Sequence, residues 1–130
     1  MKKKFIIICS IIILLLGGIV ALHFYKTTKV EKFNIEEYKQ YIIDFPSDEI
    51  LGSIDDADMA KEKAEYIWRK IYGDSIKDER PYKVFIDDSN DAWLVTGSLH
   101  TGLFSSKKGG TAHIIIKKSD GKVLAIWHEK

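Results

Sequence analysis

Four short apolar runs near the C-terminus decide the fold of this chain: Pro81-Tyr82-Lys83-Val84-Phe85-Ile86, Asp91-Ala92-Trp93-Leu94-Val95-Thr96-Gly97, Gly109-Gly110-Thr111-Ala112-His113-Ile114-Ile115-Ile116 and Ser119-Asp120-Gly121-Lys122-Val123-Leu124. Turn residues separate the runs, which is typical of an antiparallel meander. We therefore expect strands near residues 82–87, 91–99, 110–118 and 122–128. The longer connection at 101–110 is either a hairpin tip or a functional loop.

Two helices are expected before these strands. The first begins at Asn34, whose side chain can cap it, and ends before Pro46. Phe33 before the cap can pack on Tyr38 as a hydrophobic staple. The second helix covers about 57–72, with Gly73 as its C-cap and an apolar stripe at helical spacing formed by Ala60, Ala64, Ile67, Trp68 and Ile71. Helices followed by an antiparallel sheet predict an α+β domain with four strands.

The N-terminus predicts a membrane segment. Lys2, Lys3 and Lys4 precede residues 5–22, which carry no charge. As a helix these residues measure ~27 Å, just enough to span a bilayer. The lysines favour a cytoplasmic N-terminus, so a single-pass anchor would place the C-terminal domain outside the cytoplasm. Cleavage after Ala21 as a signal peptide, which would secrete the domain, is the alternative, and the length favours the anchor.

The chain divides into three parts on this reading: a membrane segment at 1–25, a linker at 26–32 and one folded domain at 33–130. The folded part holds fourteen Lys and Arg against eighteen Asp and Glu, a net charge of −4. A basic footprint for nucleic acid is absent from it, so no nucleic-acid partner is expected. The one cysteine, Cys9, lies in the apolar run and has no partner for a disulfide.

No enzyme chemistry is predicted. His100, His113 and His128 fall on different strands or strand ends and lack the close spacing of a metal site. No nucleophile motif accompanies them. We therefore expect no catalytic residue, no metal and no cofactor.

An ordered set of residues runs through the C-terminal part of the chain. It consists of Tyr72-Gly73 at the end of the second helix, Pro81-Tyr82, Trp93-Leu94-Val95-Thr96-Gly97, Gly109-Gly110, Asp120-Gly121-Lys122 and His128. In this order the set resembles the bacterial immunity-protein family with a nuclear-transport-factor-2-like fold. The resemblance implies helices on a curved, cystatin-like sheet. It also implies a binding protein, not an enzyme, that neutralises a cognate toxin.

Two kinds of residue are candidates for partner contacts. Tyr82, Trp93 and His113 could line a pocket between helix and sheet, although core packing explains a tryptophan in a strand equally well. Asp55, Asp56 and Asp58 could dock a basic toxin, although capping the second helix also explains them. The alternative function is a membrane-anchored module that binds a small ligand or an envelope component.

Overall fold

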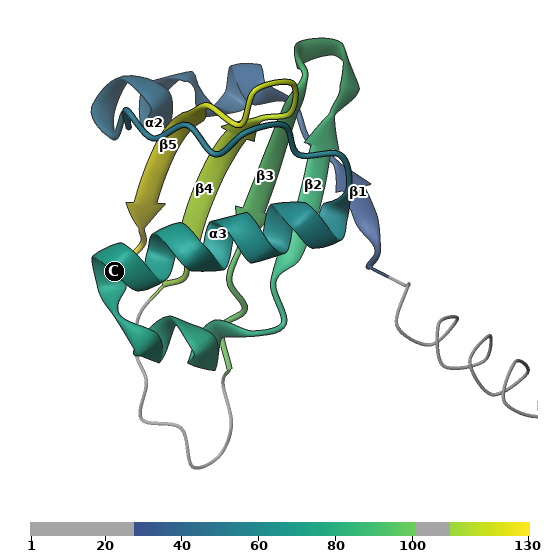
Figure 1. The fold of residues 1–130 in the computed structure, drawn as a ribbon. Helices are drawn as coiled ribbons and strands as arrows, with labels where there is room; N and C mark the ends of the chain where they lie inside the picture. The colour runs from purple at the N-terminus through teal and green to yellow at the C-terminus, as the bar shows by residue number, and fades with distance from the viewer. Residues whose placement is uncertain (1–27, 101–109) are drawn as a thin grey trace, which may run out of the picture.

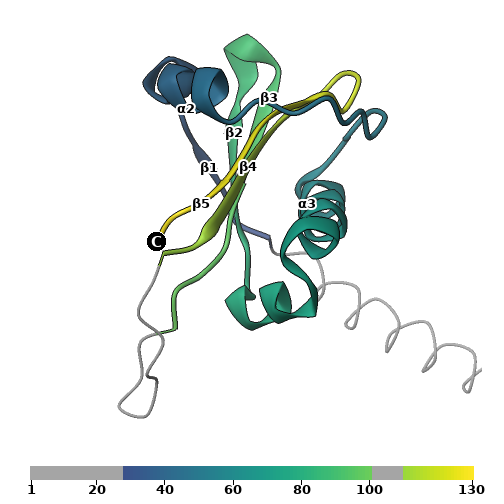
Figure 2. The ribbon, with the colours of Figure 1, turned by 90° about the vertical axis from the view of Figure 1, so that its left-hand side faces the viewer.

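The computed structural model describes residues 28–100 and 110–130. They form a five-stranded sheet in the order β1-β2-β3-β4-β5, with helices on both faces (Figure 1 and Figure 2). The strands are β1 (Val30–Lys32), β2 (Lys83–Asp87), β3 (Ala92–Thr96), β4 (Ala112–Lys117) and β5 (Val123–His128). The α-helices are α2 (Lys39–Asp44) and α3 (Ala57–Tyr72), and the 3₁₀ turns are η1 (Ile35–Tyr38), η2 (Asp74–Glu79) and η3 (Asp88–Asn90).

The α+β class and the four antiparallel strands β2 to β5 are confirmed, but the four-stranded sheet is wrong. A fifth strand, β1, pairs in parallel with β2, so that Val30 lies opposite Val84 and Lys32 opposite Ile86. The strand falls inside the predicted linker at 26–32. It was missed because three exposed residues, two of them charged, carry no alternation signal. Long-range pairing with β2 makes this segment a strand.

Helix α3 has the predicted bounds. The Asp56 side chain accepts the Met59 N–H at 2.8 Å and caps the start, and Gly73 ends the helix at φ 82°. The apolar stripe is buried from Ala57 to Trp68. Ile71, which was expected on this stripe, is exposed. Helix α3 crosses the sheet, and its last turn lies toward the edge strand β5 (Figure 1).

The sheet is buried on both faces. Under α3, Trp68 packs with a first core of side chains from every antiparallel strand, among them Val84, Val95, Ile114, Ile116 and Val123. On the opposite face, η1 and α2 cover a second core (Figure 2). That core contains Leu94, Ile115, Ala125 and Trp127, with Phe33, Ile35, Tyr38 and Ile42 packed against it. Each fully buried aliphatic side chain stabilises the fold by about 1.5–3 kcal/mol.

The segment that covers the second face forms the 3₁₀ turn η1 followed by the short helix α2. The single helix expected from Asn34 to Phe45 is not formed. The Asn34 side chain does cap η1, accepting the Glu36 N–H at 3.0 Å. Phe33 and Tyr38 meet edge to face at 5.8 Å, which confirms the staple. Asp87 ties this segment to the sheet, because its Oδ2 accepts both the Ile35 N–H and the Asn90 side-chain N–H at 2.9 Å.

The chain between α2 and α3 covers the outer edge of β5. The Ile126 N–H donates to the Phe45 carbonyl at 3.1 Å, and the Val123 N–H donates to the Glu49 carbonyl at 2.9 Å. Gly121 lies against this segment at φ +72°, and a Cβ there would come within 2.0 Å of the Gly52 carbonyl oxygen. An unpaired sheet edge invites pairing with other chains, so this segment protects the fold.

Two predictions lie wholly or mainly outside the described residues: the membrane segment at 5–22 and the loop at 101–110, of which only residue 110 is described. Within the ranges 28–100 and 110–130, no helix is long and apolar enough to cross a bilayer.

Replacing Gly121 by alanine should strongly destabilise the protein. Gly121 and Gly73 share a positive φ, but a Cβ at Gly73 meets nothing within 4 Å. The comparison variant Gly73→Ala therefore reports backbone strain alone, about 1–3 kcal/mol at the φ of 82° and ψ of −173° of this residue. Gly121→Ala adds the clash with Gly52 and should cost clearly more in urea denaturation. Equal losses in the two variants would contradict the close packing of the 45–52 segment on β5.

The Asp87 contacts predict a pH-dependent contribution to stability. The Ile35 backbone N–H, followed by the Asn90 side chain, lowers the pKa of the Asp87 carboxyl below its ordinary value. The stabilisation that the Asp87 carboxylate contributes is therefore complete at pH values above the unfolded-state pKa of about 3.9. It is lost as the pH falls through the lower pKa of the folded state. Asp87→Asn should reduce the free energy of unfolding at pH 7, with a difference that shrinks in acid.

The control for this experiment is Asp88→Asn, because the Asp88 carboxylate meets the exposed Lys32 ammonium. Exposed ion pairs contribute little to stability, so Asp88→Asn should change the free energy of unfolding only slightly at every pH. A difference between Asp87→Asn and the unmodified protein that persists unchanged at the acid end would show that charge at Asp87 is unimportant.

Candidate functional site

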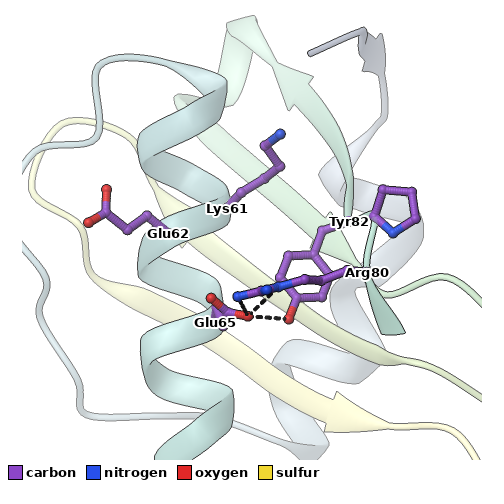
Figure 3. A pocket seen from close by; sticks show the side chains of 6 residues that line it. Lys61, Glu62, Glu65, Arg80 and Tyr82 are labelled. Carbon is purple, nitrogen blue, oxygen red and sulfur yellow. Dashed lines mark hydrogen bonds and ion pairs between the residues drawn. The ribbon is translucent and has the colours of Figure 1, made fainter. Parts of the chain in front are cut away.

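A pocket of about 490 Å³ opens between α3 and the start of β2 (Figure 3). Lys61, Glu62 and Glu65 line it from the helix. Arg80, Pro81 and Tyr82 line it from the segment that leads into β2. Glu65 lies one helical turn from both Lys61 and Glu62.

Glu65 holds the polar groups of this pocket together. Its Oε1 accepts hydrogen bonds from Arg80 Nε at 2.8 Å and from the Tyr82 hydroxyl at 2.9 Å (Figure 3). Burial, followed by the hydrogen bond to Glu65, raises the pKa of Tyr82 well above its ordinary value. The hydrogen bond to Glu65 also raises the pKa of Arg80. The three groups satisfy one another, so they brace η2 and β2 against α3.

A second group of side chains lies on the opposite face of the sheet. Trp127 is stacked between Tyr41, at 4.4 Å between ring centroids, and His113, at 4.9 Å. Two nitrogens in this stack, Trp127 Nε1 and His113 Nδ1, are buried without a hydrogen-bond partner in the described part of the chain. Such atoms are uncommon in folded proteins and call for an explanation. His113 Nε2 lies 3.0 Å from a carboxylate oxygen of Glu129.

The His113 ring is held in its neutral form. Burial lowers the pKa of His113 below its ordinary value, although the charge of Glu129 acts in the opposite direction. A protonated ring would place a second N–H in a buried position, where the described residues offer it no acceptor. Burial therefore acts against a charge in this stack, and the Glu129 carboxylate lies at its border.

The structure does not bring the three predicted pocket residues together. Trp93 lies in the first core, where its Nε1 donates to the Ile54 carbonyl at 3.0 Å. Tyr82 lies on the same side and reaches the pocket with its hydroxyl. His113 is on the other face, opposite Thr96 and Trp127. Sequence alone left the register open, and the register decides which residues share a face.

The predicted acidic group at the start of α3 is exposed. Asp56 caps the helix, and Asp58 forms an ion pair with Lys61 at 3.4 Å. Asp55 lies beside them on the surface. Both expected roles are compatible with this position, and docking of a basic partner by these carboxylates stays a prediction.

Several residues of the ordered motif set surround a carboxylate that the sequence did not single out, that of Glu79. Its oxygens accept the Ala112 N–H at 2.7 Å and lie 2.9 Å from His128 Nε2. Gly97 leaves room for it, since a Cβ there would come within 2.3 Å of Glu79 Oε1. Tyr72 stacks edge to face on the His128 ring at 5.4 Å. The Glu79 carboxylate thus links η2 to β4 and β5, and no local sequence signal marks it.

The remaining motif residues have backbone and packing roles. Asp120 Oδ1 accepts the Lys122 N–H at 2.9 Å, which closes the turn before β5 around Gly121. Gly110 lies against the backbone of Glu129. Val95 is buried in the first core, and Pro81 borders the pocket.

No metal centre is formed by the described residues: within 28–100 and 110–130, no three His, Cys, Asp or Glu side chains gather in a suitable arrangement. His128 bonds Glu79, and His113 meets Glu129. His100 approaches the Arg80 carbonyl. Each of these three histidines thus contacts a different group.

Comparison with known proteins gives one match. Residues 59–130, which span α3, η2 and strands β2 to β5, match the family model described as NTF2 fold immunity protein. No curated protein and no solved structure matches the chain.

The pocket network predicts energetic coupling between Tyr82 and Glu65. Tyr82→Phe removes one hydrogen bond to a carboxylate and should cost about 1.5–3 kcal/mol in the free energy of unfolding. In a double-mutant cycle with Glu65→Gln, the coupling energy should exceed about 0.5 kcal/mol. Tyr66→Phe is the control, because Tyr66 is an exposed tyrosine of the same helix. Additive effects of Tyr82→Phe and Glu65→Gln would show that the network does not brace the pocket.

Proposed function

Because the chain belongs to the NTF2 fold immunity protein family, we propose that it protects a bacterium by binding a cognate toxin one to one. The observation that carries this proposal is the family match over residues 59–130. The match includes α3, which covers the first core, and every strand except β1. It therefore spans the framework of the domain and not an isolated motif.

The proposed mechanism is occlusion of the toxin without covalent chemistry. The polar groups of the pocket support it, since Glu65, Arg80 and Tyr82 are engaged with one another. The net charge of −4 over residues 33–130 favours approach of a basic partner. Affinity then depends on surface complementarity, with charge steering the encounter.

The proposed location is the outer side of the cell membrane. Residues 5–22 are long and apolar enough for a single span, and the lysines at positions 2–4 favour a cytoplasmic N-terminus. Residues 23–29 would then join the membrane to β1, a distance of at most about 25 Å. An anchored domain of this kind meets its toxin at the envelope.

The pocket favours a second candidate, a module that binds a small ligand. Its volume of about 490 Å³ lies in the range of small-molecule sites. A ligand there would have to compete with the Glu65 hydrogen bonds for the Arg80 and Tyr82 donors. Toxin binding is the better-supported function because the family match supports it directly.

Co-expression tests the proposed function. Each large gene product encoded beside this protein is expressed alone and then with the full-length chain, and growth is measured. We expect one toxic neighbour to be neutralised, and we expect protection to disappear when residues 1–25 are deleted, because the domain then stays in the cytosol. Protection by the deleted form would place neutralisation in the cytosol. A failure to protect against any toxic neighbour would overturn the proposal.

The ratio of the two proteins tests the mechanism. Protection by one-to-one binding should end when the toxin is expressed in excess over this protein. An enzyme that destroys the toxin would continue to protect under the same excess, so continued protection would count against occlusion.

A further inference from the structure

The cover of the second face carries exposed aromatic rings. Tyr41 is 38 % exposed and Phe45 is 45 % exposed, and their rings stack at 6.4 Å. Adjacent exposed aromatics are unusual on a monomer surface, and they are common at the centres of protein interfaces. The rings lie on the side of α2 that faces β5, since Tyr41 also stacks on Trp127.

Carboxylates surround these rings. Residues 34–50 contain five acidic side chains against one basic side chain, Lys39, which is paired with Glu36. Glu37 and Asp44 of this segment are exposed, and so is Glu129 at the end of the sheet. Burial raises the pKa of Tyr38, and the charges of Glu37 and Glu129 raise it further, so both carboxylates act on this surface. We call Tyr41, Phe45, Glu37, Asp44 and Glu129 the acidic aromatic patch.

A buried donor lies directly beneath the patch. Trp127 is only 5 % exposed, and its Nε1 has no acceptor within the described residues. Tyr41 covers its ring at 4.4 Å. An unpaired buried N–H carries a free-energy cost. Arginine and lysine side chains have no acceptor, so only a backbone carbonyl of the partner could remove this cost. This observation is independent of the surface charge, and it marks the same place on the molecule.

We propose that the acidic aromatic patch docks an arginine-bearing basic surface of the toxin, which extends the proposed function to a particular surface. A guanidinium group can stack on the Tyr41 ring and bond the Asp44 or Glu37 carboxylate with its planar fork. Lysine lacks the planar fork and stacks less often. The patch therefore selects arginine over lysine as well as basic over acidic partners.

Two other arrangements fit the structure less well. A symmetric dimer through this patch would place the same carboxylates opposite each other, and like charges oppose such contacts. The acidic group at Asp55, Asp56 and Asp58 already stabilises the start of α3, with Asp56 as cap and Asp58 paired with Lys61. The patch on α2 combines charge, exposed rings and an unpaired donor in one place.

The three tryptophans provide a direct test. In full-length protein held in nonionic detergent and labelled with ¹⁵N at the indoles, Trp68, Trp93 and Trp127 give separate N–H signals, and Trp127→Phe identifies the third. The probes are decapeptides of alternating arginine and glycine, lysine and glycine, or glutamate and glycine. The arginine peptide should move the Trp127 signal most, the lysine peptide less, and the glutamate peptide not at all.

The other two indoles are internal controls, because both donate to backbone carbonyls: Trp68 to His113 at 3.4 Å and Trp93 to Ile54 at 3.0 Å. Asp44→Lys should weaken binding of the arginine peptide roughly tenfold, and Asp55→Lys should leave it unchanged. An unmoved Trp127 signal, or an equal loss of binding in Asp55→Lys, would overturn the assignment of the patch.

Growth protection supplies the second readout. Against a toxin that the unmodified protein neutralises, Tyr41→Ala and Asp44→Lys should each lose protection, whereas Asp55→Lys and the exposed-ring control Tyr66→Ala should keep it. Thermal unfolding verifies that each variant is folded. Protection that survives both patch variants overturns the docking surface. If the unmodified protein neutralises no toxin, the proposed function fails, and the peptide titration still decides whether the patch binds arginine.

Discussion

A sheet that is apolar on both faces needs a cover on each, and the rest of this structure follows from that constraint. Strands β3 and β4 have buried residues on both of their sides, so they cannot leave one side in water. Helix α3 covers one face with a regular stripe of small and large apolar residues. The other face depends on two short turns of helix that would not be stable alone and are held by Asn34, Asp87 and the Phe33–Tyr38 contact.

The sequence predicts α3, which covers the first face, better than it predicts η1 and α2, which cover the second face. The sequence predicts the position of helix α3 well, because its period, the aspartates at its start and its terminal glycine all agree. Strands β2 to β5 were located by their apolar runs, with ends uncertain by one to three residues. Strand β1 and the division of the 34–45 segment were not predicted, since both depend on contacts with β2 that lie some fifty residues away.

In the candidate sites, too, some residues are predicted from the sequence and others are brought together only by the fold. The sequence predicts Tyr82 as a site residue, and Tyr82 does reach a pocket. Nothing in the sequence indicates its partner Glu65, because only folding brings α3 beside β2. His113 is also predicted, yet it stacks with Trp127 on the face away from Tyr82. Phe45 follows the apolar spacing expected for the first helix and Tyr41 does not, yet both rings are exposed. In sequence they belong to an amphipathic helix, and only the position of α2 over the edge of β5 leaves them exposed.

The family match and the second cover occupy different parts of the chain. The match begins at residue 59, inside α3, and contains the strands with most of the first core. Residues 33–50, which cover the second face and carry most of the acidic aromatic patch, precede it. Stability of the matched framework therefore depends on a segment outside the match, because that segment seals the second core and the β5 edge. Residues 33–50 thus complete the fold and also carry most of the surface that we propose for docking, with the Glu37 and Asp44 carboxylates beside its exposed rings.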